Sequence, residues 1–274
     1  MPAINTNTAA NAAVRYLNVN SAQETSSLSK LSSGSRITSA SDDAAGLAIS
    51  TRISSDVTTL QQAATNASQA TAILQTADGG ASNISDILAR MKSLASESAS
   101  GTTTDSSRAY INSEFSQLTS EIDSIATGTR YSSQSLLDGS SVFASGVSVL
   151  VGSSGSDTIT ITLSSLTASS LSVSSLDVST QSGATSALTA LDTAIDTVSA
   201  ARASIGAQES RFNFSADSIS TQTQNLQAAN SAIKDVDIAA EQSKLSSAEV
   251  KTQAAVSALA AANQMPQYLL KLLG

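Results

Sequence analysis

Apolar residues recur along most of this chain at alternating steps of three and four residues. Such spacing places them on one face of an α-helix, and its repetition over many turns is typical of helices that pack along their whole length. The pattern predicts helices over residues 5–33, from 41 to a turn at Gly101, over 105–127, from 184 to about 236, and over 237–273.

The second predicted helix carries the longest ladder, which begins at Ile53. A doubled three-residue step at 71–74–77 resembles a stammer, which overwinds a coiled coil locally. A helix of this length would extend roughly 80 Å and needs neighbours along its length, so we expect a bundle. The positions expected in its core are Ile53, Val57, Leu60, Leu74, Ile84, Leu88, Met91, Ile111, Phe115, Leu118, Ile122, Leu188, Leu191, Ile195, Val198, Ile205 and Phe212.

Between Tyr131 and Ser182 the pattern changes from helical spacing to alternation of apolar and polar residues. The alternating runs are 147–151, 158–163 and 171–173, which predict two or three short strands in hairpins. The predicted fold class is therefore mostly α, a long antiparallel helical bundle or coiled coil with a small β-hairpin insert. The two chain ends, similar in length and pattern, are expected to pair side by side.

Composition excludes several classes of function. The 274 residues include no Cys, His or Trp, and the net charge is −8. Soft-ligand metal sites, histidine acid–base pairs and disulfides are thereby excluded, and a basic groove for nucleic acid is not expected. No apolar run is long enough to span a membrane, and the first residues do not read as a cleavable secretory signal. We expect no enzyme activity, no cofactor, no metal, no nucleic acid and no membrane insertion.

Both ends of the chain contain motifs of a known family. At the amino-terminal end, Ala3–Asn7, Leu31–Ile37 and Asp42–Ile49 resemble bacterial flagellins. At the other end Arg202–Gln208, Asp235–Glu241 and Ala262–Gln267 resemble the same family, in the expected order. The resemblance implies a short-form flagellin that lacks the variable outer domains, and a function as the exported structural subunit of the flagellar filament, the propeller for swimming motility.

The family architecture implies a division into domains. Residues 1–40 and 231–274 would form the two halves of an inner coiled coil. Residues 41–138 and 184–230 would form an outer helical domain, with the β-hairpin insert at 139–183. The implied partners are further copies of the chain, the flagellar cap and junction proteins, an export chaperone on the C-terminal segment and the flagellar secretion apparatus. The implied location is the extracellular filament, reached without a cleaved signal peptide.

Three sets of residues are candidates for assembly and recognition. The expected inner-tube seam contains Val14, Leu17, Leu28, Leu31, Val256, Leu259, Leu269 and Leu270. Charged candidates for contacts between subunits are Arg52, Asp56, Arg90, Lys92, Glu114 and Arg130, for which an ordinary solvated face is an equally good interpretation. Arg90 and Leu94 match a segment that innate-immune receptors read in some flagellins, although Ser93 replaces a frequent Glu there.

Three alternatives remain open at this level. A hook–filament junction protein shares the terminal architecture, although the blocks at 41–49 and 262–267 favour flagellin. A cytoplasmic helical signalling or scaffold bundle would lack both the insert and the terminal motifs. A zinc protease, found in some flagellins, needs paired histidines, and this chain has none. The carboxylates Asp42 and Asp43 fit helix capping better than a cation site.

Overall fold

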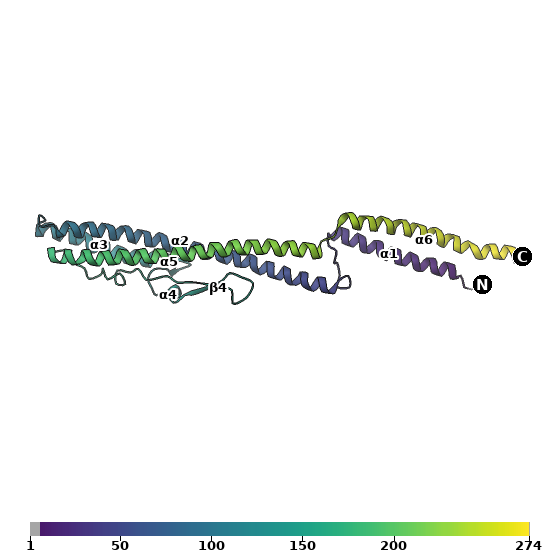
Figure 1. The fold of residues 1–274 in the computed structure, drawn as a ribbon, viewed down its shortest axis with the longest axis horizontal. Coiled ribbons are helices and arrows are strands. Elements are labelled where there is room, and N and C mark those ends of the chain that lie inside the picture. Colours follow the sequence, from purple (N-terminus) through teal and green to yellow (C-terminus); the bar gives the residue numbers. More distant parts are fainter. Residues whose placement is uncertain (1–5, 274) are drawn as a thin grey trace. The chain divides into compact units, whose positions relative to one another are not determined.

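A computed structural model describes residues 6–273 of the chain. Helices dominate it, with four short strands between the third and fifth helices (Figure 1). The elements are α1 (Thr8–Ser33), α2 (Ala44–Ala99), α3 (Asp105–Gly128), β1 (Arg130–Tyr131), β2 (Gln134–Ser135), α4 (Val142–Ser145), β3 (Val147–Leu150), β4 (Thr158–Ile161), α5 (Gln181–Lys234) and α6 (Ile238–Leu273). The predicted fold class is confirmed, as are the long helices.

The chain divides into two compact units, which we call the terminal unit and the central unit. The terminal unit comprises Met1–Ser55 and Asn225–Gly274, and the central unit comprises Asp56–Gln224. Helices α2 and α5 each contribute to both units.

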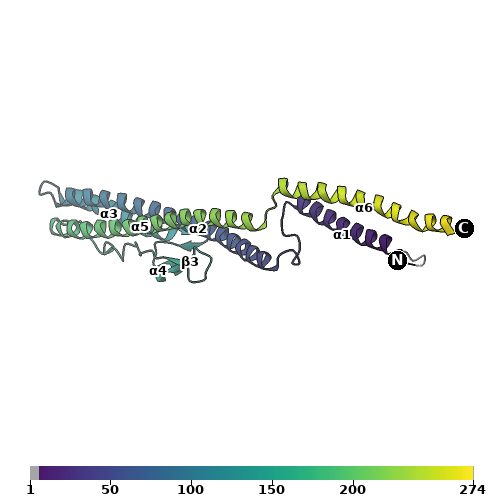
Figure 2. The ribbon, with the colours of Figure 1, turned by 45° about the vertical axis from the view of Figure 1, so that its right-hand side comes forward.

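Helices α2, α3 and α5 lie side by side in the central unit (Figure 2). The buried row of α2 is regular and contains Leu60, Ala63, Ala67, Ala70, Leu74, Ala77, Ala81, Ile84, Leu88, Met91, Ala95 and Ser98. Its steps alternate between three and four without interruption, so the predicted stammer is wrong. Ala63 and Ala70 are buried where the sequence pattern favoured Ala64 and Thr71, which are partly exposed. Adjacent alanines look equivalent in a sequence, and only the packing decides which of them faces the core.

Most of the predicted core positions are buried in the structure. The half-buried exceptions share places near helix ends or at the rim of the bundle, and they are Ile53, Val57, Leu118, Leu188 and Ile195. The remaining predicted core residues, Leu60, Leu74, Ile84, Leu88, Met91, Ile111, Phe115, Ile122, Leu191, Val198, Ile205 and Phe212, are each at most 8% exposed.

The segment between α3 and α5 contains two antiparallel hairpins. Strands β3 and β4 pair with Val147 opposite Ile161, in the two runs predicted as strands. The predicted run 171–173 is not a strand, because Ser172 takes a positive φ of 58° in a turn that buries both Leu171 and Val173. The small hairpin β1–β2 lies before residue 139 and was not predicted, since strands of two residues carry no periodicity.

Helix side chains hold the backbone of this insert in place. The Gln208 amide on α5 accepts a hydrogen bond from the Thr162 N–H (2.9 Å) and donates one to the Thr162 carbonyl (3.0 Å). From α3, Asp123 accepts from the Ala168 N–H (2.8 Å) and Asn112 from the Val178 N–H (3.0 Å). The insert therefore satisfies its polar backbone through the bundle as well as through its own short strands.

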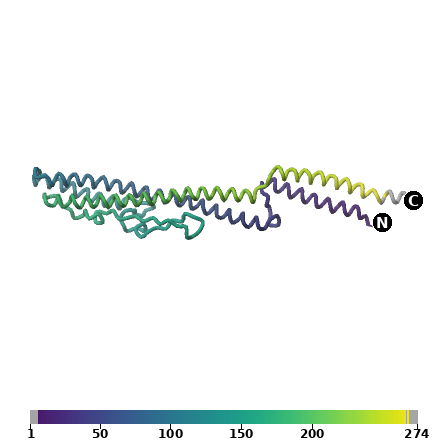
Figure 3. Tube along the Cα trace, in the orientation of Figure 1, coloured from purple at the N-terminus to yellow at the C-terminus, as the bar shows by residue number. Residues whose placement is uncertain are grey.

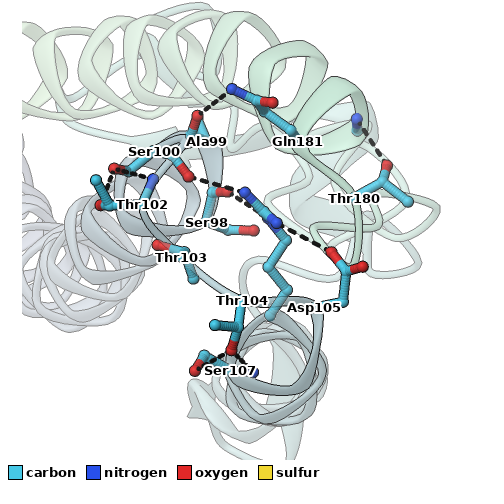
Figure 4. Close-up of polar contacts among 12 residues, drawn as sticks. Ser98, Ala99, Ser100, Thr102, Thr103, Thr104, Asp105, Ser107, Thr180 and Gln181 are labelled. Carbon is cyan, nitrogen blue, oxygen red and sulfur yellow. Dashed lines mark hydrogen bonds and ion pairs between the residues drawn. The ribbon is translucent and has the colours of Figure 1, made fainter.

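Polar side chains also close the end of the bundle where α2 turns into α3. Arg108 of α3 donates to the carbonyls of Ser98 and Ser100, both at 2.8 Å, and its side chain is only 8% exposed. Figure 4 shows Gln181, at the start of α5, reaching the carbonyl of Ala99. These donors satisfy carbonyl groups that the end of a helix leaves without partners.

Candidate assembly surface

The link between α1 and α2 is a compact turn that its own side chains define. Gly34 ends α1 with a φ of 68°, a left-handed conformation that favours glycine. One Asp42 carboxylate oxygen accepts hydrogen bonds from Thr38 Oγ1 and from the N–H groups of Thr38 and Ser39 at 2.9–3.0 Å. These bonds, first the one from the Thr38 hydroxyl, lower the pKa of Asp42 to about 2.

The second carboxylate of the pair begins α2. Asp43 accepts a hydrogen bond from the Gly46 N–H (2.8 Å), as an N-cap residue does. A side chain at Gly46 would overlap the side chains of Asp43 and Ile37, so a larger residue there requires both to shift. Asp43 therefore has the predicted capping role, whereas Asp42 holds the turn that precedes α2.

The same link binds the segment between α5 and α6. The backbone N–H of Arg36 donates to the Lys234 carbonyl (2.6 Å), and the N–H of Val236 donates to the Gly34 carbonyl (3.1 Å). The guanidinium of Arg36 donates twice to the Ile233 carbonyl. The link between α1 and α2 and the link between α5 and α6 are thus hydrogen-bonded to each other, beside the last residue of α1 and the first residue of α6.

Helices α1 and α6 lie side by side and antiparallel (Figure 3). Asn7 donates to the carbonyl of Ala262 (2.8 Å) at one end of the pair, and Ser27 contacts Glu241 at the other. On α6 the buried residues are Glu241, Leu245, Ala248, Ala255 and Ala262, again at heptad spacing. In the row that the two helices share, three of these five residues are alanines and the buried residue of α1 is Ser27, so this pair buries little apolar surface by itself.

A charged side chain lies inside this row. The side chain of Glu241 is 7% exposed; one oxygen accepts from the Ser27 hydroxyl (2.8 Å) and the other from the Lys244 ammonium (2.8 Å). Hydrogen bonds from Lys244 and then Ser27 lower the pKa of this carboxyl below its ordinary value. Both oxygens have a partner, which is what a buried carboxylate requires.

The predicted seam residues lie on different faces of the two helices. Leu17, Leu31 and Leu259 are half-buried in or beside the shared row, whereas Val14, Leu28 and Val256 are 40%, 58% and 51% exposed. The side chains of Leu269 and Leu270 lie outside the described residues. Further exposed apolar side chains on the terminal unit are Val19, Ile238, Val250 and Met265. The pairing row and the exposed apolar faces are therefore separate surfaces of the same helices.

Several of the predicted contact residues have partners within the chain. Arg90 and Glu114 form an ion pair at 2.7 Å, and Lys92 pairs with Asp192. Arg130 donates to the Thr127 carbonyl (2.7 Å). Arg52 is exposed and Asp56 is half-exposed, so these two are the strongest candidates for the predicted contact between subunits. Of the two candidate receptor residues, Leu94 is buried in the bundle and Arg90 is exposed.

Sequence reasoning missed the polar side chains that organise the structure. Ser27 and Arg108 lie outside the motifs, and the motif that contains Gln208 did not indicate its role. Ser27 contacts the distant Glu241 side chain, whereas Arg108 and Gln208 bind backbone atoms of other segments. Glu241 did leave a signal, because it occupies a core position of the heptad ladder. The same signal applies to Arg202, which pairs with Asp78 at 2.8 Å.

These features define a class of protein: a long helical subunit with a weakly buried terminal helix pair and exposed apolar faces suited to packing against further subunits. Among the described residues no helix is long and apolar enough to cross a membrane, and no cluster of three acidic, histidine or cysteine side chains could hold a metal ion.

Comparison with known proteins identifies the family. The family model of the bacterial flagellin N-terminal helical region matches residues 4–142, and that of the C-terminal helical region matches residues 188–273. The chain belongs to the bacterial flagellin family and is a short-form member, a structural subunit of the flagellar filament.

Relatives of known name agree over the whole length. The chain is 36% identical to a flagellin of Halalkalibacterium halodurans, covering 98% of this chain and 99% of the relative. It is 34% identical to a flagellin of Bacillus subtilis over the same shares, and 33% identical to the flagellar filament 30.7 kDa core protein of Treponema maltophilum.

Two solved structures have a similar fold. The crystal structure of Bacillus cereus flagellin is 29% identical, with a TM-score of 0.52 over 61% of this chain and 94% of that one. A putative flagellar hook-associated protein from Vibrio parahaemolyticus has a TM-score of 0.57 over 71% of this chain and 100% of that one. Because its identity is 15%, this second likeness concerns the fold alone.

Proposed function

We propose that copies of this chain assemble through the exposed apolar faces of the α1–α6 pair. In the resulting extracellular filament, the α1–α6 pairs of all copies would line the inner part. The observation that carries the proposal is the separation of surfaces in this pair: an alanine-rich row joins the helices, while Val14, Leu28 and Val256 remain exposed. Contiguous exposed apolar surface favours association. Neighbouring subunits would bury these faces in heterologous contacts, which build an open helical filament when the rotation between copies does not close a ring.

The narrow row also bears on folding before assembly. Ordering a residue costs about 1–2 kcal/mol, and a helix pair joined mainly through alanine buries too little apolar surface to offset that alone. The terminal helices would then order only when neighbouring copies cover them. A terminal segment without stable structure suits export through a narrow channel by the flagellar secretion apparatus without a cleaved signal peptide. An export chaperone would cover the C-terminal segment until then.

Substitutions on the exposed faces test the proposal. Leu28→Asp and Val250→Asp place a charge on an exposed apolar position of α1 and of α6. Each is expected to raise the critical concentration for salt-induced polymerisation at least tenfold, because burying an unpaired carboxylate between subunits is unfavourable. Pelleting assays and electron microscopy give the readout.

Two controls separate the apolar surface from a general effect of charge. Leu28→Met keeps the surface apolar and is expected to polymerise like the wild type. Ser116→Asp adds the same charge on an exposed position of α3 in the central unit, outside the terminal pair. Normal filaments from Leu28→Asp would contradict the assignment of this face.

The hook–filament junction protein is the alternative that the sequence left open, and the likeness to the hook-associated protein, which concerns the fold alone, does not favour it. The names of the full-length relatives favour the filament subunit instead. In a motile strain that produces this flagellin, deletion of its gene is expected to abolish the filament. Release of intact filaments into the medium would favour the junction protein. The cap and junction proteins at the filament ends are further proposed partners.

A further inference from the structure

Phe214 is one of several large apolar or aromatic side chains of the central unit that lie outside its core, together with Tyr110, Tyr131 and Val142. Phe214 on α5 is 75% exposed, whereas Phe115, Phe143 and Phe212 are buried. It lies two residues beyond Phe212, and at 100° per residue it therefore points away from the side of α5 that faces the bundle. Its neighbours one turn away on α5 are Ser210, Arg211, Asp217 and Ser218, all exposed. The ring therefore projects into solvent between two serines and two charged side chains.

A hollow on the same unit is suited to an aromatic ring. It has a volume of about 250 Å³ and lies between α2 and strand β3. Apolar side chains line much of it, and its polar groups are amides and a hydroxyl. The residues are Asn66, Gln69, Ala70, Ile73, Ser148, Val149 and Leu150. A cavity of about 150 Å³ is large enough to hold benzene, so the space admits a phenyl ring.

The ring and the hollow lie at the same level along the central unit. Helices α2 and α5 are antiparallel, and Gln75 of α2 donates to Glu209 of α5 (2.9 Å). Phe214 follows Glu209 by little more than one turn, and the hollow lies within the turns that precede Gln75. The two features occupy different faces, because Phe214 points outward from α5 and the hollow lies between α2 and the hairpin. They cannot meet within one chain.

We propose that Phe214 of one copy inserts into the hollow between α2 and β3 of a neighbouring copy. This contact rests on the proposed assembly into a filament and adds a specific lateral contact in the central unit. It joins two different surfaces, so it is of the heterologous kind that builds an open helical filament when the rotation between copies does not close. Buried aromatic side chains in pockets are the residues that most often dominate an interface, and this chain has few aromatics.

Cysteine cross-linking tests the contact directly, because the natural chain contains no cysteine. Two single variants are copolymerised: Ser210→Cys, one turn from Phe214 and therefore retaining it, and Gln69→Cys at the rim of the hollow. Mild oxidation of the filaments is expected to yield covalent dimers that contain one chain of each kind. Ser210→Cys mixed with Gln117→Cys, on an exposed position of α3, is the matched control and is expected to yield at least tenfold fewer.

Truncation of the ring tests its contribution to assembly. Phe214→Ala is expected to raise the critical concentration for polymerisation about tenfold, because an aromatic anchor is lost. Phe214→Leu keeps a large apolar side chain, so its critical concentration is expected to stay close to that of the wild type. Because Phe214 is exposed, circular dichroism of the unassembled variants is expected to match the wild type. Cross-linking no better than the control, or unchanged polymerisation of Phe214→Ala, would overturn this contact. Failure of the wild-type chain to form filaments would instead overturn the proposed function.

Discussion

At the scale of single residues, polar side chains of the helices bind backbone atoms at the ends of elements. Arg108 satisfies two carbonyls at the end of α2, Gln208 binds both backbone groups of Thr162, and Asp123 binds the N–H of Ala168. Each replaces a partner that a helix or strand would have supplied. Removing such a side chain leaves buried groups without hydrogen bonds, which costs more than the bond itself contributed.

Arg108→Ala is therefore expected to destabilise the chain by about 2 kcal/mol, since two carbonyls lose a charged donor. Urea unfolding followed by circular dichroism measures the change. Arg130→Ala, which removes an exposed guanidinium, is the matched control and should change the free energy of unfolding by less than about 0.5 kcal/mol. Equal stability of the two variants would show that the buried position of Arg108 has no special role.

At the scale of elements, heptad spacing was sufficient to predict the long helices and most of the core. It could not predict which of two adjacent alanines, Ala63 or Ala64, faces inward, because both fit an apolar row. The alternation of apolar and polar residues favoured a strand at 171–173, where both apolar side chains face inward from a turn. For the assembly surface, the spacing identified α1 and α6 but not the separation between their pairing row and their exposed faces. That separation depends on the rotation of each helix, which follows from contacts such as Ser27 with Glu241.

The two glycines in the middle of α2 have opposite surroundings. A side chain at Gly79 would meet nothing within 4 Å, whereas one at Gly80 would overlap Thr129 and Leu137. Gly79→Ala is expected to stabilise the chain by about 0.5–1 kcal/mol through helix propensity. Gly80→Ala is expected to destabilise it by about 1–3 kcal/mol through overpacking. Thermal and urea unfolding of both variants check the difference, and an equal gain from both would refute the close approach at Gly80.

The Glu241 carboxylate makes the α1–α6 pair sensitive to acid. Its pKa in the folded pair lies below the ordinary value of 4.5. Its contribution to stability is therefore fully present above about pH 4.5 and is lost as the pH falls through the lowered pKa. As the pH falls from 5 through the lowered pKa, filaments of Glu241→Gln should lose less stability than wild-type filaments. Light scattering during acid dissociation measures this difference. Parallel dissociation curves for the two proteins would argue against this role of Glu241.

At the scale of the whole molecule, the two units differ in how completely a single chain buries its apolar residues. The central unit encloses most of its own core, whereas α1 and α6 share an alanine-rich row and leave Val14, Leu28 and Val256 exposed. Hydrogen exchange is expected to be fast in the amides of both terminal helices in the unassembled chain and slow in the filament, while α2 residues 60–95 are protected in both. Strong protection of the terminal helices before assembly would contradict folding on polymerisation.

The most direct test of the account is an electron cryo-microscopy reconstruction of filaments grown from the purified chain. The account predicts a helical tube in which the α1–α6 pairs form the inner wall and Leu28, Val250 and Val256 are buried between neighbouring copies. A tube in which these side chains face water, or failure of the chain to form tubes under seeded conditions, would contradict it.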